Sequence, residues 1–128
     1  MNTTKFDTAW TSYEFHQSIL DNLQDKNNEV IVKYNNFLNQ TSHVEPPPRK
    51  EVVKLRREMN QSYDELIVAY EKCLSSIRDL ISINNLEPLS VPDDMRVSNE
   101  CLEEYKSITH SHYELAKMEQ EEINEVLS

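Results

Sequence analysis

Residues 63–80, YDELIVAYEKCLSSIRDL, carry the strongest structural signal in the chain. Apolar side chains recur in this stretch at alternating steps of three and four, which is the spacing of a heptad seam on one face of an α-helix. At its centre, residues 66–70 are all apolar, and at about 100° per residue such a run reaches around the whole helix. The middle of this helix therefore needs cover from more than one side. A β-strand over residues 65–70 would suit the β-branched side chains, but the heptad continues through it without a turn signal, so a helix is favoured.

The same seam extends in both directions and predicts a helix over about residues 49–84, which starts after three consecutive prolines. The central stripe of this helix consists of Val52, Met59, Tyr63, Leu66, Tyr70, Cys73, Ile77 and Leu80. Its flank consists of Leu55, Ile67, Leu74 and Ile81. This surface is wider than a two-stranded coiled coil needs. The helix is therefore expected at the centre of the packing.

A second heptad seam precedes this helix, over a predicted helix of about residues 5–40. Its positions are Phe6, Ala9, Tyr13, His16, Leu20, Leu23, Asn27, Val30, Tyr34 and Phe37. His16 and Asn27 interrupt the seam with polar groups, and two interpretations of them remain open. A buried Asn in a seam fixes register or partner number at some cost in stability, whereas at the wet edge of the seam both side chains would be solvated.

A third helix is predicted over about residues 94–126, after a connection that contains Pro88 and Pro92. Asp93 or Asp94 can cap its first amides. Its expected seam is the thinnest of the three and consists of Leu102, Tyr105, Ile108, His112, Leu115, Met118 and then Ile123 or Val126. Acidic side chains continue through its last turns, where the helix dipole prefers cations, so this end is expected to fray unless something basic lies beside it.

The fold class that follows is all-α: an elongated antiparallel three-helix bundle, or coiled coil of long amphipathic helices, within a single domain of residues 1–128. The 128 residues contain no glycine, which removes the residue that hairpin turns and phosphate-cradling loops depend on. The connections at about residues 41–48 and 85–93 are long enough to reverse the chain twice. An up-down-up path places the second helix between the other two.

Charge and cysteine content point to an intracellular protein of the nucleus or cytoplasm. The formal net charge is −10, so nucleic acid and anionic membranes should be repelled by the molecule as a whole. No segment resembles a membrane span, and the N-terminus lacks the pattern of a signal peptide. Cys73 and Cys101 are expected as free thiols, the alternative being a disulfide between the second and third helices in an oxidising compartment.

Catalytic, metal and cofactor sites are not expected. His110 and His112 are two residues apart, which points them to different sides of a helix, whereas a shared metal needs neighbours at three or four. The carboxylate pairs lie in solvated, charged surroundings that give no reason for a perturbed pKa. The sequence contains no nucleophile elbow, P-loop or His-Glu-x-x-His pattern.

The stretch EPPPRKEVVKLRREM, residues 45–59, interrupts the acidic background with a basic patch of five side chains. The basic patch consists of Arg49, Lys50, Lys54, Arg56 and Arg57. With Glu51 as the one acid among residues 49–57, the local charge is +4. Three partners for the patch remain open: nucleic acid or phospholipid, an acidic protein, or the acidic end of the third helix. The acids concerned in the last case are Glu114, Glu119, Glu121, Glu122 and Glu125.

The surplus of apolar helix surface predicts a non-catalytic scaffold or adaptor subunit that packs with other helical subunits in a larger complex. The layout is similar to that of small helical subunits of transcription (Mediator), kinetochore and vesicle-tethering complexes, an analogy of overall layout without a shared motif. The residues expected to pack against partner helices are Leu66, Ile67, Tyr70, Leu74, Ile77, Ile81, Tyr34 and Phe37. The alternative is a self-sufficient helical adaptor that binds nucleic acid or anionic phospholipid through residues 49–57.

Overall fold

Three long helices make up the structure, a computed structural model that describes residues 3–41, 49–86 and 99–127. They are α1 (Thr3–Gln40), α2 (Arg49–Leu86) and α3 (Asn99–Leu127). The bounds of α1 and α2 lie within two residues of those predicted. The connections, and with them the predicted start of the third helix and its capping by Asp93 or Asp94, lie outside the described residues.

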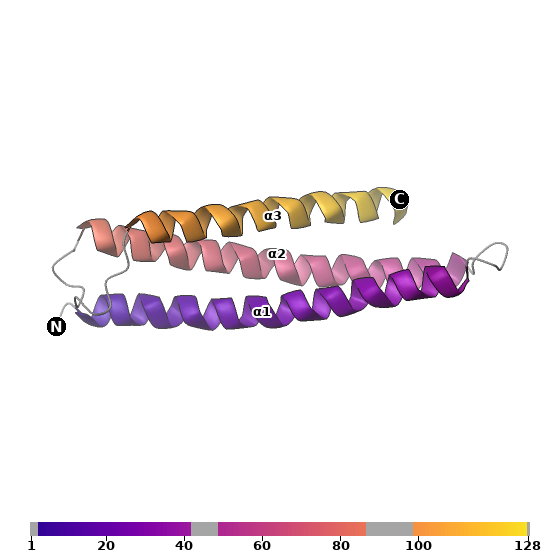
Figure 1. Cartoon of the computed structure of the whole chain (residues 1–128), viewed down its shortest axis with the longest axis horizontal. Helices are drawn as coiled ribbons and strands as arrows, with labels where there is room; N and C mark the ends of the chain where they lie inside the picture. The colour runs from indigo at the N-terminus through magenta and orange to yellow at the C-terminus, as the bar shows by residue number, and fades with distance from the viewer. Residues whose placement is uncertain (1–2, 42–48, 87–98, 128) are drawn as a thin grey trace.

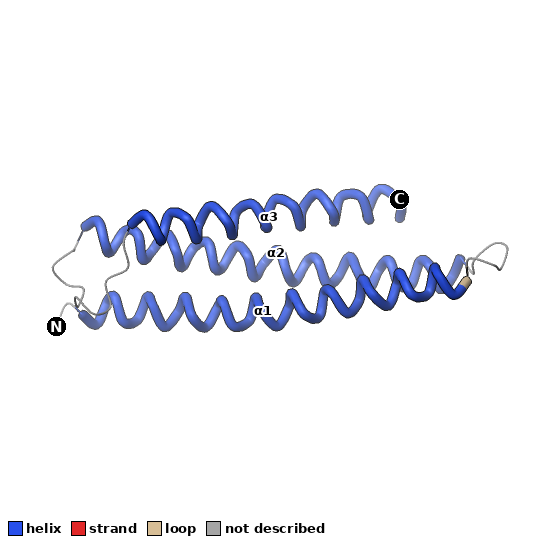
Figure 2. The backbone as a smooth tube through the Cα atoms, viewed as in Figure 1, coloured by secondary structure: helices blue, strands red, loops and turns tan. Residues whose placement is uncertain are grey.

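The helices pack as an elongated antiparallel bundle in which α2 lies between α1 and α3 (Figure 1). The broad interfaces join α1 to α2 and α2 to α3. Within the described residues the chain is helical, with no strand (Figure 2). The predicted all-α three-helix bundle is thereby confirmed. Because α3 is shorter than its neighbours, it ends before the end of the bundle at which α1 finishes and α2 begins (Figure 1).

The predicted seams of α1 and α2 are confirmed, since all of their positions are buried or half-buried. α2 is covered from two sides, as the apolar run at residues 66–70 requires. Leu66, Ala69 and Tyr70 of that run are buried, whereas Val68 points away from both neighbours and keeps 49% of its surface exposed. Packing against α1 and α3 therefore covers this apolar run, except at Val68.

Two apolar clusters form the core. One gathers Leu20 of α1 and Ala116 of α3 around α2, where Tyr63, Leu66 and Tyr70 belong to it. The other lies toward the N-terminal end of α1 and consists of Phe6, Leu80 and Leu102, with the ring of Trp10 stacked at 6.2 Å on that of Phe6. Each cluster takes at least one residue from every helix. Core formation thus ties all three helices into one bundle.

Asn27 is buried in the seam between α1 and α2, with 5% of its surface exposed. Its Nδ2 donates a hydrogen bond to Oγ of Ser62, itself buried, at 3.0 Å. Of the two interpretations of Asn27, the structure supports the buried one. Sliding α1 along α2 would separate these two polar groups and leave them unpaired, which costs about 1–3 kcal/mol per group. The pair therefore fixes the register of the two helices.

The predicted seam of α3 is wrong over most of its length. Leu102 is buried, but Tyr105, Ile108, Leu115 and Met118 are exposed. Leu102 and Ile123 of the predicted seam do face the bundle interior, and the other inward side chains are Thr109, Tyr113, Ala116 and Gln120, all buried or half-buried. The small side chain of Ala116 lets α3 approach the tyrosines of α2, and Gln120 hydrogen-bonds to the Asn60 carbonyl oxygen at 3.4 Å and to the Asp64 side chain. These contacts with α2 select the inward face, and they leave the larger apolar side chains outside.

Candidate partner-helix interface

The residues predicted to pack against partner helices lie mostly in the core of the chain itself. Leu66, Tyr70, Leu74 and Ile77 are buried. The other four are half-buried, namely Ile67, Ile81, Tyr34 and Phe37. Their packing against another protein stays a prediction, and an exposed apolar surface lies elsewhere.

That surface is a row of apolar side chains on α3, which we call the α3 stripe. It consists of Tyr105, Ile108, Leu115 and Met118, each between 42% and 60% exposed. Ile108 and Leu115 are one heptad apart, with His112 between them, so the row follows the helix at seam spacing. The sequence identified these residues as a seam, but the seam faces outward.

Part of the α3 stripe borders a groove between α1 and α3, with α2 as its floor. Since both α1 and α3 run antiparallel to α2, they are parallel to each other along this groove. A hollow of about 350 Å³ in the groove is bordered by Asn28 of α1 and by His112 and Leu115 of α3. Tyr63 and Tyr70 line it from α2. All three helices thus contribute to one concave surface.

Hydrogen bonds tie both walls of the groove to its floor. Nε2 of Gln24 donates to the Tyr70 hydroxyl at 2.8 Å, and the Tyr63 hydroxyl donates to Oε2 of Glu119 at 2.6 Å. The His112 ring meets the Tyr70 ring edge-on at 6.4 Å. Burial raises the pKa of both tyrosines, and at Tyr63 the Glu119 carboxylate raises the pKa further. Both hydroxyls are therefore kept protonated, which preserves the hydrogen bond that Tyr63 donates to Glu119.

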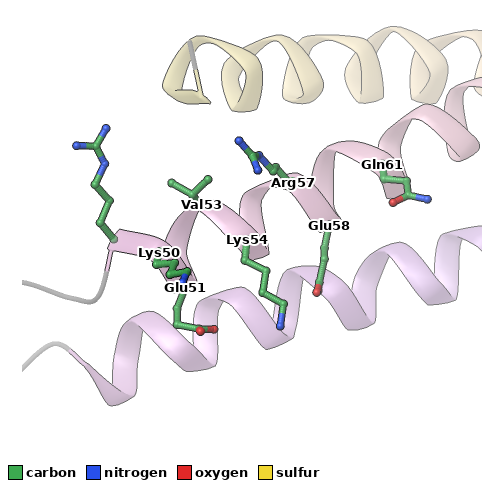
Figure 3. A pocket seen from close by; sticks show the side chains of 8 residues that line it. Lys50, Glu51, Val53, Lys54, Arg57, Glu58 and Gln61 are labelled. Atoms are coloured by element: carbon green, nitrogen blue, oxygen red, sulfur yellow. The ribbon is translucent and has the colours of Figure 1, made fainter.

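The basic patch divides between two directions. Arg56 turns to α1, where its Nε donates to the Tyr34 hydroxyl at 2.8 Å and its guanidinium lies 5.7 Å from the Tyr34 ring centre. Arg49, Lys50, Lys54 and Arg57 instead line an open hollow of about 910 Å³ along α2 (Figure 3). Arg56 therefore has a structural role, and the other four form a basic surface.

Pairing of the basic patch with the acids of α3 stays a prediction. Figure 3 shows Arg57 directed toward α3 and Lys54 directed toward α1. Of the five acids proposed for the pairing, Glu119 accepts from Tyr63, and Glu114 lies 3.7 Å from Nε2 of His110 on its own helix. These two carboxylates therefore already have partners outside the basic patch.

The described histidines and cysteines, namely His16, His110, His112, Cys73 and Cys101, belong to no candidate metal cluster. Among the described residues, no group of three or more His, Cys, Asp or Glu is close enough to hold a metal ion. His110 lies against Tyr113, whereas His112 lies against Tyr70, so the two rings diverge as their spacing predicts. Cys73 and Cys101 do not form a disulfide. Burial raises the pKa of the Cys73 thiol to about 11, and Asp21 nearby contributes to the shift.

Comparisons with other proteins add no functional information. None of the helices, over the residues that the structure describes, combines the length and the apolar character that crossing a membrane requires. No protein-family model, curated protein or solved structure matches the chain. A functional proposal therefore rests on the surfaces of the bundle itself.

Proposed function

We propose that the chain is a non-catalytic helical subunit that joins a larger protein complex by helix packing, in the nucleus or cytoplasm. The observation that carries the proposal is the exposure of the α3 stripe. Complete burial of a large apolar side chain contributes about 1.5–3 kcal/mol. Covering the remaining half of four such side chains would contribute roughly 3–6 kcal/mol, a substantial part of the roughly 8 kcal/mol of a micromolar complex.

The spacing of the α3 stripe favours a helical partner. Side chains at steps of three, four and seven form a straight ridge along a helix, and such a ridge packs into the groove of another helix or between two of them. A different protein is a better partner than a second copy, because the net charge of −10 makes copies of the chain repel one another. Transcription, kinetochore and vesicle-tethering complexes contain small helical subunits of this layout, and they define the class of assembly proposed.

The proposal predicts stoichiometric companions for the chain purified at moderate salt from the cells that produce it. Size-exclusion chromatography with light scattering should give a mass well above 15.1 kDa. The double variant Ile108→Glu, Leu115→Glu should lower recovery of the companions by more than tenfold, since it places two charges in the apolar contact. Its melting temperature should change by only a few degrees, because both positions are exposed.

Val68→Glu is the matched control, since Val68 is an equally exposed apolar residue on α2. It should leave the companions in place. Recovery of the native chain as a monodisperse 15.1-kDa monomer would contradict the proposed function. Loss of companions with Val68→Glu, and not with the double variant, would contradict the assignment to the α3 stripe.

A second candidate function is binding of an anionic ligand by the basic hollow, and a specific observation favours it. Within residues 3–41, 49–86 and 99–127, Arg49, Lys50, Lys54 and Arg57 have no carboxylate within ion-pair distance. Glu58, which also lines the hollow, is already paired with Lys33 of α1 at 3.2 Å. The four cations are therefore available to the phosphates of nucleic acid or of phosphoinositides.

Under this second function, Arg49→Glu with Lys50→Glu and Arg57→Glu should abolish binding to a labelled single-stranded oligonucleotide or to phosphoinositide-containing vesicles at 50 mM salt. Arg56 is left unchanged because it holds Tyr34. Arg78→Glu, at an exposed site elsewhere on α2, is the control and should bind normally. Absence of binding by the native chain to both probes would exclude this function.

A further inference from the structure

We propose that the groove between α1 and α3 receives one amphipathic helix of a partner protein, with basic side chains along its α1 edge and apolar side chains along its α3 edge. The inference rests on the proposed function and names the chemistry of the partner. Three features carry it: an apolar wall, a floor that fits a fourth helix, and a wall of acids without cations.

The apolar wall belongs to α3. Tyr105, Ile108 and Leu115 are all exposed. The first and the last of them lie ten positions apart, or about 15 Å at 1.5 Å per residue. Leu115 borders the hollow directly. Burial raises the pKa of the Tyr13 hydroxyl on α1, and Tyr105 of α3 contributes to the shift. Leu115 therefore places the apolar row at the edge of the groove, and a partner helix of about three turns would cover Tyr105, Ile108 and Leu115.

The floor and the packing of the bundle favour a helix over a loop or a strand. α1 and α3 each pack broadly on α2, while Leu20 of α1 and Ala116 of α3 meet in one core cluster over it. This places α1, α2 and α3 at three corners of a four-helix bundle, with α1 and α3 on the diagonal. A helix at the fourth corner would run antiparallel to α1 and α3, as adjacent helices do in an up-down bundle.

The other wall, on α1, is acidic. Asp7, Glu14 and Asp21 follow one another at heptad intervals, and Asp25 comes one turn later. Asp25 borders the hollow, and Asp21 raises the pKa of the buried Cys73 thiol, so both lie toward the groove. No cation lies within ion-pair distance of these four carboxylates in the part of the chain that the structure describes.

Lys26 and Lys33 of α1 lie away from this wall. Lys26 pairs with Glu65, and Lys33 pairs with Glu58, each at 3.2 Å on the flank of α2. α1 thus directs cations to its contact with α2 and carboxylates to the groove. A partner helix with Lys or Arg beside α1 would relieve the repulsion among the acids. A second copy of the chain fits poorly, because the residues of α3 around the stripe include Glu104, Glu114 and Glu122, and would add more acids.

The test is site-specific photo-crosslinking within the complex from cells that produce the chain. A photoreactive residue replaces Asn28 on the α1 wall or His112 on the α3 wall, both of which border the hollow. Control positions are Ile19, which lies on the opposite side of α1 from Asp21 by helix geometry, and Val68 on α2. Crosslinked peptides are then sequenced by mass spectrometry.

Both groove positions should crosslink to the same segment of one companion, and that segment should carry apolar residues at steps of three and four with Lys or Arg beside them. Crosslinks to a second copy, to an acidic segment or to one without helical periodicity would overturn the inference. So would crosslinks from Ile19 or Val68 alone, although the proposed function would then stand. Failure to recover any companion with the unmodified chain would overturn both.

Charge reversal provides an independent readout in the same complex. Asp21→Lys with Asp25→Lys should weaken the complex about tenfold at low ionic strength, with a smaller effect as salt rises. Glu71→Lys with Asp79→Lys, also at exposed sites but on α2, should have little effect. Equal effects of the two double variants would mean that net charge, rather than the groove, controls assembly, and would overturn the inference.

Discussion

Leu66→Asp is expected to abolish the cooperative thermal unfolding of the chain. Leu66 is 5% exposed and lies in the cluster that joins Leu20 of α1 to Ala116 of α3. A carboxylate at this position would be buried without a partner, which costs several kcal/mol. Because single domains are stable by only about 5–15 kcal/mol, the variant should be largely unfolded. Circular dichroism at 222 nm, followed against temperature, measures the effect.

Val68→Asp is the matched control for this variant. Val68 lies two residues away on the same helix, but 49% of its surface is exposed. Surface substitutions of this kind usually change the free energy of unfolding by no more than about 0.5 kcal/mol. If both variants unfold, or if both melt like the native chain, α2 does not occupy the centre of the bundle.

The second large effect is a loss of stability at alkaline pH. Burial raises the pKa of Cys73 from 9.0 to about 11, so the folded state favours the neutral thiol. The resulting stabilisation is fully present below pH 9 and is lost as the pH rises through 11. A shift of this size corresponds to about 3 kcal/mol. Burial also raises the pKa values of Tyr13, Tyr63 and Tyr70. Ionisation of these tyrosines therefore also lowers the stability of the folded chain, at higher pH.

Urea unfolding at pH 7, 9, 10 and 11 measures this dependence through the free energy of unfolding. Stability should change little from pH 7 to 9 and fall steeply above pH 10. Cys73→Ala removes the thiol contribution and should leave a shallower decline that belongs to the tyrosines. Constant stability of the native chain from pH 8 to 11 would contradict the burial of these four groups.

The success of the sequence-based prediction differs between the helices for a physical reason. In α1 and α2 most of the large apolar residues occupy the positions that face neighbouring helices, so heptad spacing identifies the core. In α3 the large apolar residues and the inward residues form two different rows. Ala116 and Gln120 face inward because of what they contact on α2, and this information is absent from the pattern of α3 itself.

Specific polar pairs were beyond prediction for a similar reason. The hydrogen bonds from Asn27 to Ser62 and from Arg56 to Tyr34 join different helices. They depend on how far one helix is shifted along the other, and heptad spacing does not determine that shift. One feature of the groove is visible in the sequence itself, because Asp7, Glu14 and Asp21 lie at heptad spacing on a helix face without lysine. A search for periodicity in charge, alongside that in apolar residues, identifies such a wall.

The packing of each helix on its neighbour in sequence also determines how the chain reaches its fold. The broad interfaces of the described residues join α1 to α2 and α2 to α3, but most native contacts are local ones within the helices, whereas contacts between helices, such as that of Phe6 with Leu80, join distant residues. Helical proteins with such low contact order fold within microseconds to milliseconds, because little chain entropy is lost before contacts form. A helical bundle of this kind should complete its own fold quickly, so in the proposed complex the chain would meet its partners as a preformed surface, and assembly rather than folding would limit the rate.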